Sequence, residues 1–331
     1  RNERNPRECD CLVVDELSMV DAYVFESLLR ALPFSCRLVL VGDNDQLPSV
    51  GAGNVLGDLI ASGLFPTVQL KEIFRQSQES LIVMSAHRIV EGKMPDLRRH
   101  DSDFFFLPQE DPQKAAQLIV SLCSVRLPRS YGYSSVTDIQ VLCPGRKGEL
   151  GTVELNKHLR EAINPPARGK AEAKVNGALF RLGDKVMQTR NNYDVLWEKD
   201  DGEAGSGIFN GDVGTVEDID PSGELVTIRF DDRTSVYTAD LLSQLDMAYA
   251  MTVHKAQGSE YRAVVLVSAP AAPNLLVRGV LYTAITRARE LLVMVGDDAI
   301  PGRMAENDRR TRRYSGLRRR LKQGGPNHGH E

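Results

Sequence analysis

Two adjacent carboxylates at the end of a short apolar run constrain the fold of this chain more than any other feature. The run Cys11–Val14 is rich in β-branched residues and stops at Asp15 and Glu16. Such a run is typical of a central strand in a parallel sheet, buried on both faces. Because open α/β sheets bind ligands beyond the carboxyl ends of their strands, the pattern predicts that both acids point into a site.

The acidic pair suits metal-assisted phosphate chemistry. One carboxylate can hold a hydrated Mg²⁺ ion, and the other can orient or deprotonate an attacking water. A plainer interpretation is equally open at this point, because Asp, Glu and Ser also favour the first turn of a helix. The motif alone does not decide between these two interpretations.

A second apolar run, residues 37–41, also ends in an acid and leads into a glycine-bearing loop that contains Gln46. A glutamine beside such a site can bond a γ-phosphate oxygen or the attacking water. It can equally be an ordinary polar loop residue. Two neighbouring strands that both end in acids, followed by a glutamine, favour the first interpretation.

Arg75 follows an apolar pair at the expected junction with a second domain. An arginine supplied across a domain boundary can neutralise the charge that develops on a transferred phosphoryl group. The alternative is an interdomain salt bridge. Further on, Arg146 and Lys147 form a basic, glycine-flanked turn after a strand at 139–144. Such a turn can approach a phosphate backbone closely, although many solvated loops look the same.

The pattern of apolar and polar residues changes between residues 209 and 245. Apolar and polar residues alternate in 226–230, with turn residues at 221–223 and 231–233. Short alternating strands predict a small β-barrel inserted in the second α/β domain, which serves as a contact surface rather than as an enzyme. The acidic, glycine-rich stretch 200–207 just before it is predicted to be a mobile loop.

The α/β pattern returns in the last third of the chain. Thr252, His254 and Lys255 are crowded before a glycine turn and offer donors for phosphates, although a lone His in a loop is more often structural. A helix at 281–289 then brings Arg287 and Arg289. Both cannot be buried unpaired, so one of them must face phosphate, carboxylate or solvent.

Composition bounds the class of protein. A chain of 331 residues can form two compact domains and a small insert, and 42% hydrophobic with 26% charged residues is ordinary for a soluble protein. Five scattered cysteines suit reduced thiols, and no apolar run reaches membrane-spanning length, so a cytoplasmic location is expected. The basic run 303–322 attracts polyanions or forms a solvated tail. Since the chain enters a core strand at once, we interpret it as a piece of a longer polypeptide.

Six motifs in order resemble those of superfamily-1 helicases. They are the acidic pair, Gly-Asp-x-x-Gln-Leu-Pro, Phe-Arg-Gln, Asn-Gly-Asp-x-Gly, Thr-x-His-Lys-x-Gln-Gly-Ser-Glu and Thr-Ala-x-Thr-Arg-Ala. More narrowly, the chain is similar to RecD-like DNA helicases of the 5′→3′ branch, in their stand-alone long form. The resemblance covers residues 9–296. It implies two RecA-like α/β lobes of the P-loop NTPase type, the first incomplete, with an SH3-like barrel insert.

The resemblance also assigns roles. Asp15 is expected to hold Mg²⁺ through water, Glu16 to activate the hydrolytic water and Gln46 to sense the γ-phosphate of ATP. Arg75 and Arg287 are expected to act as arginine fingers. The remaining assignments are Gly258 and Glu260 at the nucleotide, and Thr252, His254 and Lys255 at DNA. Arg146 and Lys147 of the basic turn, and Asn210, are also predicted to contact DNA. The implied partners are single-stranded DNA and duplex junctions, in DNA repair or recombination, with protein partners unknown.

The resemblance divides the chain into segments. Residues 1–75 belong to the first lobe, 76–208 and 246–300 to the second, 209–245 to the barrel and 301–331 to a basic tail. The family's phosphate-binding loop, Gly-x-x-x-x-Gly-Lys-[Ser/Thr], is absent from this sequence. We therefore expect an active helicase in the longer parent and little or no ATP hydrolysis by this chain alone. The alternatives are a non-catalytic DNA-binding or partner-binding remnant, and the motor part of a relaxase or nuclease fusion.

Overall fold

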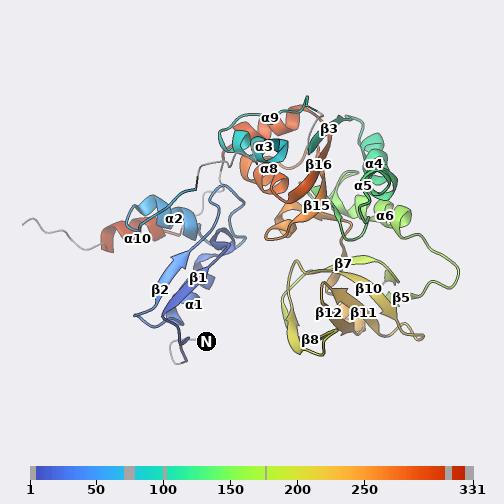
Figure 1. Cartoon of the computed structure of the whole chain (residues 1–331), viewed down its shortest axis with the longest axis horizontal. Coiled ribbons are helices and arrows are strands. Elements are labelled where there is room, and N and C mark those ends of the chain that lie inside the picture. The colour runs from blue at the N-terminus through green and yellow to red at the C-terminus, as the bar shows by residue number, and fades with distance from the viewer. Residues whose placement is uncertain (1–4, 71–78, 100–102, 176, 310–314, 325–331) are drawn as a thin grey trace, which may run out of the picture.

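The computed structural model describes residues 5–70, 79–99, 103–175, 177–309 and 315–324. These form a small α/β lobe (lobe 1, residues 5–70), a larger α/β lobe (lobe 2) and a β-rich domain that we call the barrel (Figure 1). None of the helices in these ranges has the length and apolar character needed to span a membrane.

Lobe 1 holds a two-stranded parallel sheet in which Val13 lies opposite Val39. Its elements are β1 (Cys11–Val14), η1 (Leu17–Met19), α1 (Ala22–Arg30), β2 (Arg37–Leu40) and α2 (Val55–Ser62). One face of the sheet packs on Phe25, Val55 and Leu59 from the two helices. A segment from the other end of the chain joins this layer: α10 (Leu317–Gly324) lies beside α2 (Figure 1).

The prediction that the first strand is buried on both faces is wrong for the described residues. Val13 is 61% exposed and Val39 is 41% exposed. The β-branched run was identified correctly as a strand, because β-branching favours extended backbone whatever covers it. Burial depends instead on a second covering layer, and the described residues supply a layer on one face only.

Lobe 2 is built on a five-stranded parallel sheet with strand order β14-β4-β15-β16-β3. The strands are β3 (Phe104–Pro108), β4 (Ile139–Cys143), β14 (Ala250–Thr252), β15 (Tyr261–Ser268) and β16 (Ala288–Gly296). One face is covered by α3 (Leu81–Val90), α8 (Arg278–Ile285) and α9 (Ala299–Glu306). The other is covered by α4 (Pro112–Ser121), the π-helical turn η3 (Leu122–Arg126), α5 (Leu127–Tyr131) and α6 (Thr152–Ile163) (Figure 1). Apolar strands covered on both faces are the expected form of a parallel sheet.

The barrel is a seven-stranded antiparallel sheet with strand order β13-β7-β10-β11-β12-β8-β9. Its elements are β7 (Lys185–Gln188), β8 (Asn192–Lys199), β9 (Ala204–Ile208), β10 (Val213–Ile219), β11 (Val226–Phe230), β12 (Arg233–Tyr237), α7 (Ala239–Leu242) and β13 (Leu245–Met247). A separate hairpin, β5 (Glu172–Val175) with β6 (Ala178–Arg181), contributes Phe180 to the same core.

The barrel sheet begins earlier than residue 209, where the sequence pattern placed it. Strands β7, β8 and β9 all precede Phe209, and the stretch predicted to be a mobile loop forms a turn and β9. Two causes explain the difference. The strand β7 is buried throughout and therefore lacks alternation, and Gly and Ser in β9 have low β-propensity.

The barrel is fastened to lobe 2 through the buried carboxylate of Asp184. Arg160 of α6 donates to both of its oxygens, at 3.0 and 2.6 Å, and Asn164 donates at 2.8 Å. The hydroxyl of Tyr249, just before β14, donates to the same carboxylate at 3.2 Å. A buried charge with this many partners costs several kcal/mol to uncover, roughly 3–5 kcal/mol if one partner is removed. The Asp184 carboxylate therefore joins the barrel to lobe 2 through a buried network.

Lys185, the next residue, is buried at the same junction. Its Nζ donates to the backbone oxygen of Ile139 at 3.1 Å. Burial lowers the pKa of Lys185 from 10.5 to about 8. Between those two values the unfolded chain keeps a proton that the folded chain has lost, so raising the pH favours the folded state.

Replacing Lys185 with methionine should therefore remove a pH-dependent part of the stability. Between pH 8 and pH 10 the free energy of unfolding of the wild-type chain should rise relative to that of Lys185→Met by about 2 kcal/mol. Urea titrations at each pH measure the difference. Lys174→Met, at an exposed position of β5, is the control and should change with pH as the wild type does. A constant difference between Lys185→Met and wild type would contradict the prediction.

Candidate nucleotide site between the two lobes

The acidic pair lies where β1 ends and turns into η1. Glu16 has a positive φ of 51° in the left-handed region, which is uncommon for a residue other than glycine. Oδ1 of Asp15 accepts a hydrogen bond from the backbone N–H of Glu16 at 2.8 Å. The turn leaves Asp15 exposed and Glu16 half-buried at the carboxyl end of the strand, as predicted. Strained backbone of this kind is frequent at functional sites.

The second strand-end acid, Asp43, connects the two lobes. Its Oδ2 accepts a hydrogen bond from the hydroxyl of Tyr282 in α8 at 2.8 Å and one from Nε2 of Gln46 at 3.3 Å. Burial, and then the nearby charge of Asp43, raises the pKa of Tyr282 well above its usual value. The phenol therefore stays protonated and donates to the carboxylate.

The loop after Asp43 is docked into lobe 2. Leu47 is buried within the apolar core formed with α8. Its N–H donates to Oγ1 of Thr283 at 2.9 Å, and its oxygen accepts from Nε2 of Gln257 at 2.7 Å. Gly258 faces Met19 of η1, because a Cβ at this glycine would lie 3.5 Å from the Met19 sulfur. Asp43, Leu47 and η1 of lobe 1 therefore form one interlobe contact with α8 and the glycine turn of lobe 2.

A pocket of about 160 Å³ opens beside this contact. It is lined by residues of both lobes and of the segment after α9: Ser18, 43–48, Asn54, Leu56, His254, Asn274, 277–279 and 307–309. Oγ of Ser18 and Oε1 of Gln46 are buried here without a hydrogen-bond partner among the described residues. Because a buried polar atom without a partner costs free energy, both atoms are suited to bond a bound ligand or water: Oε1 of Gln46 as an acceptor, and the Ser18 hydroxyl as a donor or an acceptor.

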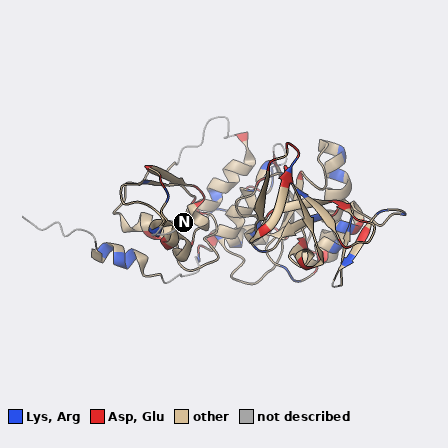
Figure 2. Ribbon diagram, turned by 90° about the horizontal axis from the view of Figure 1, so that it is seen from below, with Lys and Arg blue, Asp and Glu red and all other residues tan. Residues whose placement is uncertain are grey.

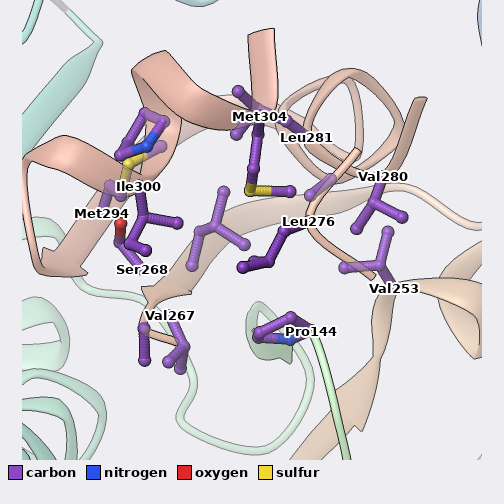
Figure 3. A pocket seen from close by; sticks show the side chains of 14 residues that line it. Pro144, Val253, Val267, Ser268, Leu276, Val280, Leu281, Met294, Ile300 and Met304 are labelled. Atoms are coloured by element: carbon purple, nitrogen blue, oxygen red, sulfur yellow. The ribbon is translucent and has the colours of Figure 1, made fainter. Parts of the chain in front are cut away.

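A second pocket, shown in Figure 3, lies between the sheet of lobe 2 and helices α8 and α9. Its volume is about 10 Å³, and its wall is almost entirely aliphatic, with Val253, Leu281 and Met304 among the lining residues. A space of this size holds one water molecule at most. This pocket is a packing gap in the core and is not a ligand site.

Arg287 lies next to the interlobe contact, because it bonds Thr283, the residue that also bonds Leu47. Its side chain is 4% exposed, with Nη1 donating to the Ser259 oxygen at 3.0 Å and Nε donating to the Thr283 oxygen at 3.2 Å. Among the described residues no carboxylate pairs with it. A longer bond of 3.4 Å joins its Nη2 to Oγ1 of Thr286. A buried guanidinium that has no carboxylate partner is suited to meet an anionic ligand. The neighbouring Arg289 is exposed, with Nε at 3.9 Å from Oε2 of Glu260.

Arg75 lies outside the described residues, so its predicted role stays a prediction. Several other residues predicted for the nucleotide site lie outside the lining of the interlobe pocket: Asp15, Glu16, Gly258, Glu260 and Arg287. Glu260 is exposed beside Arg289, next to the glycine turn.

The residues predicted to contact DNA divide into two places. His254 lines the interlobe pocket, and Thr252 is half-buried at the end of β14. Lys255 points the other way: its Nζ bonds Oδ1 of Asn210 in the barrel, and a longer bond of 3.4 Å joins it to the Thr189 oxygen. Burial lowers the pKa of Lys255.

The basic turn lies near this second place. Arg146 is exposed, with Nη2 at 3.8 Å from Oδ2 of Asp246 in β13. Lys147 is exposed in the same turn. A further basic surface is formed by α10, where Leu317 and Leu321 face lobe 1 and the basic residues are exposed; Figure 2 shows them near the end of the described chain.

Sequence reasoning missed the residues that join the lobes. Asp43, Tyr282, Thr283 and Gln257 make the interlobe hydrogen bonds, yet none was named as a site residue. A signal was present, since Asp43, Gln257 and Thr283 lie inside motifs that carried the family resemblance and Tyr282 directly precedes one of them. Their partners are more than 200 residues away in sequence, and no local pattern identifies such a pairing.

The site can be tested for its fit to Mg²⁺. Among the described residues no group of three or more His, Cys, Asp or Glu side chains is placed to hold a metal ion. Asp15 nevertheless has an exposed carboxylate whose Oδ1 accepts one backbone N–H. Mg²⁺ is commonly held by one or two carboxylates together with water and substrate phosphates. The donor set fits an ion that arrives with a nucleotide.

Comparisons with protein families match three segments of the chain. Residues 2–103 match a model described as an AAA domain, 155–230 match the SH3 domain of ATP-dependent RecD-like DNA helicases, and 247–295 match the UvrD-like helicase C-terminal domain. The order of the three is the order that the motifs indicated.

Two curated relatives extend the match over most of the chain. The ATP-dependent RecD2 DNA helicase of Deinococcus radiodurans is 35% identical over 298 residues, which is 89% of this chain and 37% of that protein. The RecBCD enzyme subunit RecD of Mycolicibacterium smegmatis is 29% identical over 326 residues, which is 96% of this chain and 55% of that subunit. The chain therefore spans between about a third and a little over half of the length of these relatives.

A solved structure has the same fold. The Pif1 helicase from Bacteroides, crystallised with ADP-AlF3 and ssDNA, aligns with a TM-score of 0.51 and 18% identity over 96% of this chain and 76% of that one. Together with the family matches, this confirms the predicted fold class of two RecA-like α/β lobes with an SH3-like insert.

Proposed function

Since the chain belongs to the RecD-like DNA helicases, we propose that the whole protein uses ATP hydrolysis to move 5′→3′ along single-stranded DNA and to unwind duplexes, in DNA repair or recombination. The observation that carries the proposal is the interlobe contact. It brings the strand-end residues of lobe 1 against α8 and the glycine turn of lobe 2, with the buried Arg287 behind them.

Each residue then has a role. Asp15 would hold a Mg²⁺ ion through water, and a bound ion would supply positive charge to offset that of the phosphates. The Glu16 carboxylate accepts a proton from the attacking water, and the amide of Gln46 bonds the water or a γ-phosphate oxygen. Arg287 stabilises the charge on the transferred phosphoryl group from the other lobe, and Arg75 is proposed to do the same.

The remaining residues bind the two substrates. Gly258 and Glu260 are proposed to contact the nucleotide. Thr252, His254, Lys255, Arg146, Lys147 and Asn210 are proposed to contact DNA, mostly through its phosphates. Gln257 connects the two functions, because it bonds the Leu47 oxygen beside Gln46 and is two residues from Lys255. We further propose that the ATP phosphates are cradled by a loop outside this chain, so that the chain alone hydrolyses ATP poorly or not at all.

Strand displacement with the longer protein tests the proposed function. With ATP and Mg²⁺, a duplex carrying a 5′ single-stranded tail should be unwound, and one carrying a 3′ tail should remain paired. A blunt duplex and ADP are the controls. Unwinding of the 3′-tailed duplex alone would contradict the polarity. Binding of single strands without any ATP turnover would support a non-catalytic remnant instead.

A further inference from the structure

We propose that Tyr193 and Phe209 form a stacking step for an unpaired DNA base where the barrel meets lobe 2. The proposal rests on the proposed function for the identity of the ligand, single-stranded DNA, and adds a base-contacting element to it. Neither ring belongs to the apolar core of the barrel.

The two rings form an exposed, fixed pair. Tyr193, in β8, is 67% exposed, and Phe209, directly after β9, is 37% exposed. Their centroids lie 5.4 Å apart with an interplanar angle of 72°, a T-shaped arrangement. An edge-to-face pair leaves an aromatic face open to a further planar group. Exposed aromatic faces are the elements that single-strand-binding proteins use to stack successive bases.

The backbone beneath Phe209 has a conformation that leaves room for its ring. Gly207 has a positive φ of 105°, and a Cβ at this position would lie 2.8 Å from Cζ of Phe209. Side chains other than hydrogen would therefore displace the ring. The Phe209 ring packs over Gly207 and against Tyr193, so the pair is already ordered before DNA binds. Binding of a base would therefore cost little free energy for ordering these side chains.

The surroundings of the pair suit a polyanion. Arg190 is exposed just before β8, and no carboxylate among the described residues pairs with it. Lys255 lies at the same end of the hairpin, bonded to Asn210, whose N–H donates to Oδ1 of Asn191 at 3.0 Å. These groups can contact the phosphates on either side of a stacked base.

Acidic residues lie mainly at the opposite end of the β8–β9 hairpin. Asp200, Asp201 and Glu203 occupy its turn. Near the rings, Asp212 is engaged by the Phe209 N–H and by Arg233 at 3.6 Å, and Asp194 is exposed beside Tyr193. The charge distribution therefore favours a strand that crosses the base of the hairpin, next to lobe 2, rather than its tip.

A short series of contacts also connects the stacking step to the interlobe contact. From Asn210 the contacts run to Lys255, then two residues along the chain to Gln257, and from there to the Leu47 oxygen in lobe 1. Two side-chain hydrogen bonds, Gln257 to the Leu47 oxygen and Lys255 to Asn210, therefore lie between the loop of Gln46 and the residue that follows Phe209. The stacked base would thus lie beside residues that are linked by hydrogen bonds to the loop containing Gln46.

Fluorescence anisotropy with dye-labelled oligothymidylate at fixed salt tests the step on this chain and on the longer protein. Tyr193→Ala should raise the Kd about tenfold or more, in the range expected for the loss of one base–aromatic contact. Tyr193→Phe should restore binding. Leu196→Ala is the matched control, because Leu196 lies on the same strand and is 73% exposed without a ring. It should change the Kd less than twofold.

An abasic oligomer of the same length separates stacking from phosphate contacts and from loss of folding. The wild type should bind it more weakly than oligothymidylate, whereas Tyr193→Ala should bind both equally. Thermal melting of each variant monitors folding. The proposal is overturned if Tyr193→Ala binds like Leu196→Ala, if its loss of affinity is the same on both oligomers, or if the wild type binds no single strand.

The outcome is distinguishable from failure of the proposed function. If oligothymidylate binding depends on Tyr193 but the longer protein displaces no strand, the helicase function fails and the stacking step stands. If strand displacement proceeds and Tyr193→Ala leaves oligothymidylate affinity and its preference over abasic DNA unchanged, the stacking step fails and the helicase function stands.

Discussion

Replacing Arg287 with alanine should lower the ATP turnover of the longer protein by about 10³–10⁵-fold, the range for loss of an arginine finger. The guanidinium is buried, bonded to the Ser259 and Thr283 oxygens, and pairs with no carboxylate among the described residues. Its charge therefore has no internal ion pair among the described residues, as the proposed finger role requires. Steady-state hydrolysis of ATP measures the loss.

Nucleotide affinity distinguishes the finger role from a folding defect. Arg287→Ala should still bind a fluorescent ATP analogue, because a finger acts chiefly in the transition state. Arg303→Ala is the control, since Arg303 is an exposed arginine of α9 that takes no part in the interlobe hydrogen bonds of Asp43 and Leu47. Turnover by Arg287→Ala within a factor of about three of wild type would remove this residue from the chemistry.

Glu16→Gln should lower turnover by about 10²–10⁴-fold, the usual contribution of a general base. Glutamine keeps the shape of the side chain but cannot accept the proton of the attacking water. The backbone at Glu16, with its φ of 51°, is strained equally by both residues, so the stability of the chain should change little. The variant should accumulate a complex with ATP bound and not hydrolysed.

A single-turnover experiment with radiolabelled ATP measures this step directly. Glu26→Gln is the control: Glu26 lies in α1 of the same lobe and pairs at the surface with Arg30 at 2.8 Å. It should hydrolyse ATP at the wild-type rate. If Glu16→Gln does so as well, another group must accept the proton.

The parts of the fold that follow from local pattern were predictable. The run at 11–14 and the run at 37–41 both form strands, and both end at acids that lie at one edge of the same sheet. Helix periodicity and strand alternation are local properties, and the order of the motifs preserved the order of the domains.

Features that depend on distant partners could not be predicted. The docking of Leu47 into the core of lobe 2 joins residues more than 200 positions apart, and the full burial of β7 removed the alternation that would have marked it as a barrel strand. The exposed face of β1 also escaped prediction, because composition reports which residues form a strand and not what covers it.

The position of α10 against α2 has a mechanical consequence. The chain leaves lobe 1 for lobe 2 and, after α9, returns to lobe 1, where Oγ of Ser315 bonds Oδ2 of Asp58 at 2.7 Å. The connecting residues 307–316 reach at most about 35 Å when fully extended. Lobe 2 is therefore connected to lobe 1 at both of its ends. This double connection keeps the effective concentration of each lobe with respect to the other high. The two lobes therefore cannot drift far from one another.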